Sequence, residues 1–242
     1  MIRFLIAATL ICNLSVSSVL ANSLTIAAGI GYKHLLQEIV QVYQNKTGHK
    51  MDQVYGDMNQ VMTQARSGDA VSLILGERDF LKASDIEFTS FHNVGKGILV
   101  VVYSNGVKLD KVGDLSNSNI TKVAMADPKK TIYGKATKEF LQNTGLYKDI
   151  EQKLVLLTTC PKIVSAIVRK DIEAGFINLT EAIYLKDKIG GYIIADREKY
   201  KPVNLVIGVI QASGNRPETL QFIDFLQKDP EAENIFVKSG LR

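Results

Sequence analysis

The chain has 242 residues, of which 46% are hydrophobic and 22% are charged, and its formal net charge is +4. Its lysines and arginines are scattered among acidic residues over the whole length, as on an ordinary solvated surface. A nucleic-acid-binding protein would instead cluster basic residues on one face with aromatic or groove-reading partners. The composition therefore favours a globular protein and argues against nucleic-acid binding.

The first 21 residues have the features of a cleavable signal peptide. Arg3 precedes an apolar stretch from Phe4 to Leu20, and the stretch ends in Val19-Leu20-Ala21, which is typical of a signal-peptidase site. A retained membrane anchor is the alternative, and Asn13 within the stretch disfavours it. Cys12 lacks the small preceding residue of a lipidated cysteine. We therefore predict a signal peptide over residues 1–21 and a periplasmic protein.

The remaining chain is long enough for two lobes. About 220 residues allow two cores of roughly 100 residues each. Cys160 is the one cysteine outside the predicted signal peptide, so an intramolecular disulfide is excluded and stability has to come from packing. No later apolar run has the length that a bilayer-spanning helix needs.

Strand and helix patterns alternate along this part of the chain, which is typical of βαβ units and a largely parallel sheet. Short apolar and β-branched runs predict strands at 24–28, 51–55, 71–75, 98–103, 123–125, 174–178 and 203–210. Apolar residues at helical spacing predict helices around 35–43, 61–65, 134–144, 161–168, 181–188, 220–226 and 235–236. Two similar strand–helix sets, a long central strand and a late return strand predict two lobes joined by a hinge, an arrangement that traps ligands.

Four turns have the placement of a ligand site in an open α/β sheet. Such sites lie beyond the carboxyl ends of strands, where helix N-termini present unpaired N–H groups and a partial positive charge. Glycines in these turns let the backbone approach a ligand, although any one of them is also explained by a tight turn. Their occurrence in equivalent positions favours a binding site. The four turns are Ala28–Gly31, Tyr55–Asn59, Ile132–Gly134 and Thr158–Pro161.

The sequence offers little for catalysis. His34 falls in a first helical turn, His49 follows a helix-ending glycine and His92 falls in a polar loop, and their spacing matches no metal or nucleophile-elbow motif. Cys160 at a helix N-terminus is a candidate nucleophile, although a small residue packed before Pro161 is the simpler interpretation. His34 also occupies the third glycine position of a dinucleotide-binding fingerprint. We expect no enzymatic activity and no cofactor.

Several segments occur in a familiar order and spacing. They are Leu24–Gly29, Tyr55–Gln60, Ala126–Pro128, Tyr133–Ala136, Glu139–Leu141, Glu173–Asn178, Glu231–Phe236 and Gly240-Leu241. In this order they resemble the periplasmic molybdate-binding proteins of ABC uptake systems, and the resemblance covers essentially the whole mature chain.

The resemblance implies an α/β, two-lobed fold of the periplasmic-binding-protein type (type II). Each lobe would contain a mixed, mainly parallel sheet flanked by helices, with residues 22–100 and 203–242 in lobe 1 and residues 101–202 in lobe 2. It also implies a monomer that carries molybdate, tungstate or a related small oxyanion to a membrane permease with an ATPase partner. Hydrogen bonds would hold the anion, without a metal.

The departures from the family pattern fall on the positions that contact ligand. Gly29 and the pair Asp57-Met58 stand where the family has serines, Tyr133 replaces a small residue, Cys160 stands at a backbone donor position, and Asn178 replaces a tyrosine. Backbone donors survive such changes, whereas hydroxyl donors do not. An ionised Asp57 pointing into the site would cost a dianion about 1–4 kcal/mol at 4 Å, unless it caps the following helix.

The resulting candidate site combines the four turns with the strand end at Asn178. Its predicted members are Gly29, Ile30, Gly56, Asp57, Met58, Asn59, Tyr133, Gly134, Cys160 and Asn178. Further hydrogen-bond donors or charges are available from Gln60, Lys96, Lys135 and Thr159. Three alternatives stay open: a different small organic anion, an adhesin or sensory partner on the same scaffold, and a metal site, for which no pair has suitable spacing among Asp57, Met58, Glu77 and Cys160.

Overall fold

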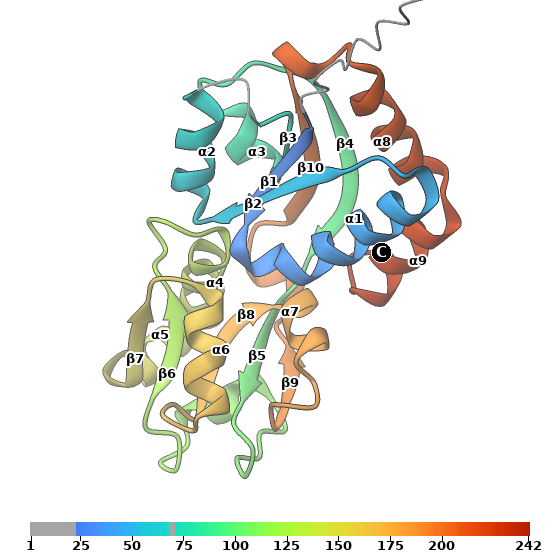
Figure 1. The fold of residues 1–242 in the computed structure, drawn as a ribbon. Helices are drawn as coiled ribbons and strands as arrows, with labels where there is room; N and C mark the ends of the chain where they lie inside the picture. Colours follow the sequence, from blue (N-terminus) through green and yellow to red (C-terminus); the bar gives the residue numbers. More distant parts are fainter. Residues whose placement is uncertain (1–22, 68–70) are drawn as a thin grey trace, which may run out of the picture.

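The computed structural model describes residues 23–67 and 71–242, which form two lobes, each built on a five-stranded sheet (Figure 1). The predicted signal peptide and Gly68, the predicted end of the second helix, lie outside the described residues. Within those residues, no helix has the length and apolarity needed to cross a membrane.

The sheet of the first lobe has the strand order β2-β1-β3-β10-β4. β1 pairs in parallel with β2 and β3, whereas β10 pairs antiparallel with β3 and β4. The strands are β1 (Leu24–Gly29), β2 (Met51–Gly56), β3 (Leu73–Glu77), β4 (Phe88–Gly97) and β10 (Val203–Ile210).

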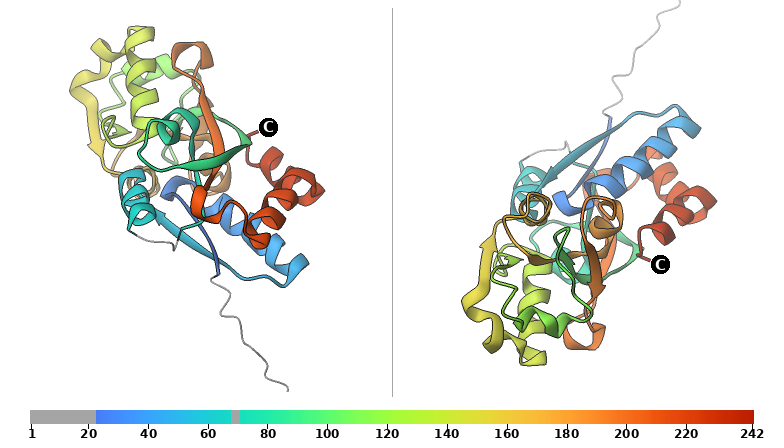
Figure 2. Two further views of the ribbon diagram at one scale, coloured as in Figure 1. Left: turned by 90° about the horizontal axis from the view of Figure 1, so that it is seen from above. Right: turned by 90° about the horizontal axis from the view of Figure 1, so that it is seen from below.

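Helices cover both faces of this sheet because its central strands are apolar on both sides. In β1, Ile26 and Ala28 pack into the cluster that contains α1, α8 and α9, whereas Ala27 packs into the cluster with α2 and α3. Figure 2 shows α8 and α9 beside α1. The helices are η1 (Ile30–Tyr32), α1 (Lys33–Thr47), α2 (Met58–Arg66), α3 (Arg78–Lys82), η5 (Gln211–Ser213), α8 (Pro217–Lys228) and α9 (Pro230–Lys238).

The second lobe repeats the plan with the order β7-β6-β8-β5-β9. Its strands are β5 (Leu99–Tyr103), β6 (Val123–Ala126), β7 (Leu154–Leu157), β8 (Ala174–Asn178) and β9 (Gly191–Ile194). Its helices are η2 (Val112–Ser116), α4 (Ile132–Thr144), α5 (Leu146–Ile150), η3 (Glu151–Lys153), α6 (Cys160–Val168), α7 (Leu179–Tyr184) and η4 (Arg197–Lys199).

The mixed sheets confirm the predicted fold class, with a larger antiparallel share than expected. In each sheet two strand pairs are parallel and two are antiparallel. The antiparallel partners surround β10 in the first lobe and β5 in the second, and each of these strands enters its lobe from the other one. A strand that starts at the boundary between the lobes is antiparallel to neighbouring strands that end at the same boundary.

Two segments of the described chain connect the lobes. The first crossing is at Ile98, between β4 and β5, and the second is the segment 195–202, between β9 and β10. The two are tied together, because Ala195 donates its backbone N–H to Leu99, and Leu99 donates its own to the Tyr200 hydroxyl at 3.0 Å. The predicted division placed Leu99 and Val100 in lobe 1, whereas both pair with β8 in the second sheet. The uninterrupted apolar run gave no sign of the crossing point.

The placement of His92 in a polar loop was wrong. His92 lies in β4 and pairs with Ile207, and its ring nitrogens contact Ser90 at 2.9 Å and Gln227 at 2.8 Å. β4 is one of the two edge strands of its sheet, so it carries polar residues where a central strand would carry apolar ones. The predicted third strand also begins two residues too early, at Val71, whereas β3 begins at Leu73.

Candidate ligand-binding site

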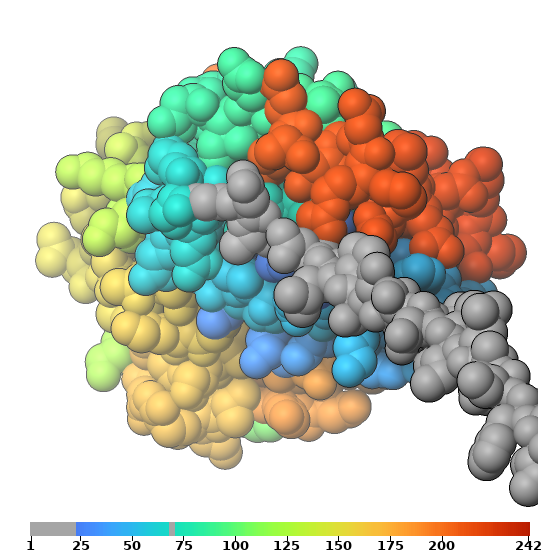
Figure 3. Space-filling model, turned by 45° about the horizontal axis from the view of Figure 1, so that its top comes forward, coloured from blue at the N-terminus to red at the C-terminus, as the bar shows by residue number. Residues whose placement is uncertain are grey.

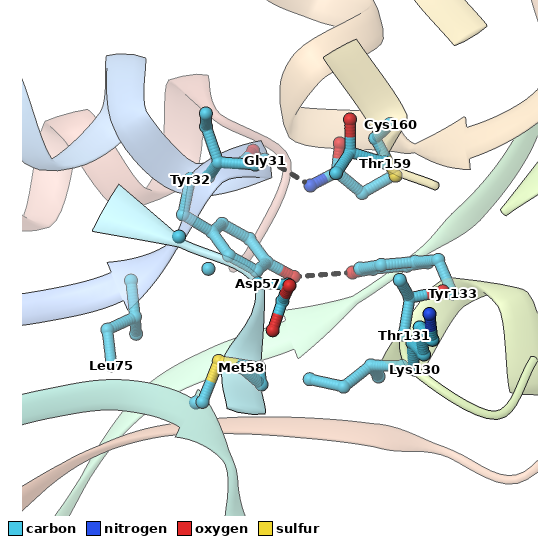
Figure 4. A pocket seen from close by; sticks show the side chains of 16 residues that line it. Gly31, Tyr32, Asp57, Met58, Leu75, Lys130, Thr131, Tyr133, Thr159 and Cys160 are labelled. Carbon is cyan, nitrogen blue, oxygen red and sulfur yellow. Dashed lines mark hydrogen bonds between the residues drawn. The ribbon is translucent and has the colours of Figure 1, made fainter. Parts of the chain in front are cut away.

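A cavity of about 60 Å³ lies between the lobes, at the point where the four predicted turns meet (Figure 4). From the first lobe it is lined by the start of η1 and the start of α2, and from the second by the starts of α4 and α6. Helix N-termini carry partial positive charge and unpaired N–H groups. Four of them facing one small space favour a negatively charged or strongly accepting ligand.

The lobes touch around this cavity. α6 of the second lobe contacts η1 of the first, and α7 contacts both η1 and α1. On the face drawn in Figure 3, atoms of the second lobe (yellow) lie against blue and cyan atoms of the first. The cavity is therefore covered on the α6 and α7 side.

The structure brings eight of the ten predicted site residues to this cavity: Gly29, Ile30, Gly56, Asp57, Met58, Tyr133, Cys160 and Asn178. Asn59 lines an adjoining, larger cavity instead. Gly134 lines neither cavity, because it lies against the end of β6, where a Cβ would come within 2.6 Å of the Asp127 carbonyl oxygen. Gly134 thus lets α4 start close to the sheet.

Sequence reasoning missed Tyr32, which lines the cavity from η1. Its hydroxyl lies 2.6 Å from that of Tyr133, and both side chains are buried. Tyr32 precedes Leu35 and Leu36 at helical spacing, so the sequence pattern makes it look like one more core residue of α1. Its position directly after a glycine turn was the available signal for the site.

Asn178 connects the lobes as well. Its Oδ1 accepts the backbone N–H of Glu181 at 3.1 Å and so caps α7, while its Nδ2 donates to the Gly31 carbonyl at 3.1 Å. The amide is therefore held in a fixed orientation at the cavity wall. One Nδ2 proton is used across the lobes, and the same amide also interacts with the Tyr32 hydroxyl.

Asp57 is the N-cap of α2. Its Oδ1 accepts the backbone N–H of Gln60 at 3.0 Å, and the Gln60 side chain accepts the Asp57 N–H at 3.1 Å, which completes a capping box. The capping role expected as an alternative to repulsion is confirmed. The carboxylate is held at the helix end, and Asp57 still lines the cavity. The side-chain oxygen of Gln60 is already used in this capping box.

Burial moves the tyrosine hydroxyls and the thiol of the cavity further from ionisation at neutral pH. Burial raises the pKa values of Tyr32 and Tyr133 above their ordinary value, so both remain neutral hydrogen-bond donors. Burial also raises the pKa of the Cys160 thiol to about 12. Burial is the main cause and the charge of Glu181 adds to it, in agreement with the simpler interpretation of a small residue packed before Pro161.

The remaining predicted groups lie outside the small cavity or serve local structure. Glu77 caps α3 by accepting the Phe80 N–H at 2.8 Å, and it lines the adjoining cavity together with Lys135. Lys96 lies on β4 and lines neither cavity, whereas Thr159 lines the small one. Among residues 23–67 and 71–242, no three histidine, cysteine, aspartate or glutamate side chains are grouped to hold a metal ion.

Two α/β lobes that enclose a small cavity lined by helix N-termini define a binding protein for a small solute. The chain belongs to the family described as bacterial extracellular solute-binding proteins, whose sequence model matches residues 24–242.

Individual relatives agree with this assignment and differ in the ligands that they are named for. The molybdate-binding protein of Rhodobacter capsulatus is 26% identical over 232 residues, which are 91% of this chain and 88% of the relative. The structure of the periplasmic molybdate-binding protein of Azotobacter vinelandii has a TM-score of 0.80 at 19% identity, covering 91% of this chain and 99% of that one. Campylobacter jejuni PEB3 with bound L-phospholactate has a TM-score of 0.73 at 15% identity, covering 91% and 99%. The similarity of this chain to the last two structures shows a shared fold.

Proposed function

We propose that this protein is the exported solute-binding component of an ABC importer and that it holds a small oxyanion, of the molybdate or tungstate class, in the cavity between its lobes. The observation that carries the proposal is the convergence of the N-terminal ends of η1, α2, α4 and α6 on one cavity of about 60 Å³. Relatives named as molybdate-binding proteins support the choice of ligand class.

The anion is bound without a neutralising cation. Backbone N–H groups at helix ends provide the donors, and the neutral hydroxyls of Tyr32 and Tyr133 stand in part for the serines that the family resemblance leads one to expect. The carboxylate of Asp57 repels the anion. Because this carboxylate also caps the α2 N-terminus, the partial positive charge of that helix end reduces the repulsion.

Binding, without chemical conversion, is the role that fits these groups. The thiol at the cavity, that of Cys160, has its pKa raised by burial to about 12 and therefore stays protonated. A signal peptide over residues 1–21 would deliver the mature chain to the periplasm, where the loaded, closed lobes would dock on a permease.

Thermal unfolding of the mature protein (residues 22–242), treated with a chelator, tests the proposal. A ligand at a hundred times its Kd stabilises the folded state by about 2.7 kcal/mol, which raises the Tm of a chain of this size by roughly 5–10 °C. We expect such a rise with molybdate or tungstate, and sulfate and chromate test selectivity. If all four leave the Tm unmoved, the oxyanion proposal fails.

Two glycine variants show whether the rise comes from this cavity. A Cβ at Gly31 would point at Asn178 and Cys160, with Nδ2 of Asn178 at 3.4 Å and Cβ of Cys160 at 3.8 Å. Gly31→Leu should therefore fill the space and remove the ligand-induced rise. Gly113→Leu is the matched control, because a Cβ at this exposed glycine meets only Lys111, at 4.0 Å. An equal rise in both variants would place the ligand elsewhere.

A further inference from the structure

A second cavity, of about 420 Å³, adjoins the small one on the side away from α7. Its first-lobe wall consists of the starts of α2 and α3, and its second-lobe wall consists of the loop before α4 and the first turns of α4. Four residues, Met58, Lys130, Thr131 and Ile132, line both cavities. The two cavities are therefore adjacent and share part of their walls, and we call the larger one the outer cavity.

Four lysines line the outer cavity. Lys129 and Lys130 lie in the loop before α4, Lys135 lies in α4, and Lys201 lies in the crossing segment before β10. All four are exposed, and none of their ammonium groups forms an ion pair with any residue of the described ranges. Three separate segments therefore place lysines without ion-pair partners in the lining of the outer cavity.

Three carboxylates, those of Glu77, Asp79 and Glu139, also line the outer cavity; none forms an ion pair with these lysines, which outnumber them by one. Glu77 accepts the backbone N–H of Phe80, and Glu139 accepts the backbone N–H of Lys201 at 3.0 Å. Asp79 is exposed on the first-lobe wall, whereas the lysines occupy the second-lobe wall and the crossing segment. Glu139 lies in α4 together with Lys135, so an anionic group in the outer cavity would meet an excess of one positive charge.

The wall that the two cavities share is partly apolar, which suits a short carbon chain lying along it. Met58 is buried, Ile132 is half-buried, and both side chains belong to the lining of each cavity. Apolar contacts of this kind favour methylene groups over water. A ligand that reaches from one cavity to the other would thus have an acidic group at each end and a short apolar part between them.

Building on the proposed function, we infer that the oxyanion in the small cavity is the head group of a small organic acid, whose second acidic group is bound in the outer cavity by Lys129, Lys130, Lys135 and Lys201. The exposed lysines act through charge, so their contribution falls with ionic strength. The fixed helix ends of the small cavity select the tetrahedral head.

Isothermal titration calorimetry with two phosphonates of equal length tests the inference. 3-Phosphonopropionate carries a carboxylate where propylphosphonate carries a methyl group, and both share one tetrahedral head. We expect 3-phosphonopropionate to bind at least tenfold more tightly at low salt, with the ratio shrinking at 0.5 M salt. Phosphonoacetate and 4-phosphonobutyrate then report which arm length reaches the lysines.

Paired lysine variants locate the second group. Lys129→Gln with Lys135→Gln should remove most of the tenfold ratio between the two phosphonates. Lys138→Gln with Lys148→Gln, at two exposed second-lobe lysines outside both linings, should preserve the ratio.

The outcomes separate this inference from the proposed function. If molybdate binds while the two phosphonates bind equally and the lysine variants change nothing, the inference is overturned and the proposed function stands. A protein that binds neither oxyanions nor phosphonates overturns both. A ratio that survives the loss of Lys129 and Lys135 but falls in the control pair also overturns the inference.

Discussion

The hydroxyl oxygens of Tyr32 and Tyr133 lie 2.6 Å apart and join the two lobes at the wall of the small cavity. Tyr32 comes from η1 of the first lobe and Tyr133 from the first turn of α4 in the second (Figure 4). One hydroxyl donates to the other, so the pair retains one O–H for a further acceptor. The contact therefore links closure of the lobes to the donors available for a ligand.

Replacing only one tyrosine of this pair should cost more than replacing both. Tyr32→Phe or Tyr133→Phe leaves a buried hydroxyl without its partner, at about 1–3 kcal/mol. The double variant removes both hydroxyls and should unfold at nearly the wild-type urea concentration. Urea unfolding of the four proteins gives the coupling energy. Costs that simply add would show that the two hydroxyls do not depend on each other.

Gly97→Ala should disturb the same contact from the hinge side. A Cβ at position 97 would overlap the Tyr133 hydroxyl and come within 3.0 Å of Val203. We expect a loss of about 1–3 kcal/mol, as for other overpacked sites. Tyr133→Phe should reduce that loss, because the nearest remaining ring carbon, Cζ, is 3.2 Å away. Gly113→Ala is the control with open space, and equal losses at both glycines would contradict the account.

The sequence predicted the turns of the site better than the residues between them. Gly29, Asp57, Tyr133 and Cys160 were found because each follows a strand signal and starts a helix, and a local pattern of that kind is readable. Tyr32 was missed, because its role depends on a partner 101 residues away in the other lobe. No local pattern encodes that distance.

The same limit applies to the fold. The buried strands β1, β5, β8 and β10 were predicted from their apolar runs, and so was the edge strand β2, whereas the other three edge strands, β4, β7 and β9, were not. Edge strands such as β9, in which Tyr192 and Ile194 are exposed, lack the two-sided burial that makes central strands recognisable. The outer cavity was missed because Lys129, Lys135 and Lys201 read as ordinary surface lysines until the lobes are placed together.

Asp57→Asn should strengthen oxyanion binding and leave stability nearly unchanged. Asparagine caps helices about as well as aspartate, so the bond to the Gln60 N–H can be kept. Removing one negative charge from the cavity wall should tighten molybdate binding by roughly tenfold, which corresponds to 1.4 kcal/mol. Calorimetry measures the change, and Asp149→Asn, at an exposed position of α5, controls for net charge. Weaker binding in Asp57→Asn would mean that the carboxylate itself contacts the ligand, as in a metal site.

Cys160 should be inert toward alkylation in the folded protein. Burial raises the pKa of its thiol to about 12, so the thiolate is scarce at pH 8, and the side chain is covered. Iodoacetamide should modify the folded protein many times more slowly than the protein in 6 M guanidinium chloride, as followed by intact mass spectrometry. Comparable rates in both states would restore Cys160 as a candidate nucleophile.

Glu181 should make the free energy of unfolding fall as the pH rises from about 5 to 8. It lies in the first turn of α7 and is 6% exposed, and burial raises the pKa of its carboxyl from the ordinary 4.5 to about 7. The folded chain therefore holds this proton more tightly than the unfolded chain does. The stability due to the protonated carboxyl is complete below pH 4.5 and is lost as the pH rises through about 7.

Glu181→Gln isolates this contribution, since the amide stays neutral at every pH. The variant should lose the decline between pH 5 and 8 and should exceed the wild type at pH 8 by an amount on the order of 3 kcal/mol at most. His34, whose pKa is lowered by burial, titrates in both proteins and cancels in their difference. Glu38→Gln, at an exposed position of α1, should keep the wild-type profile. Urea unfolding at half-unit pH intervals measures the three profiles, and parallel curves for wild type and Glu181→Gln would show that Glu181 is already ionised in the folded protein at pH 5.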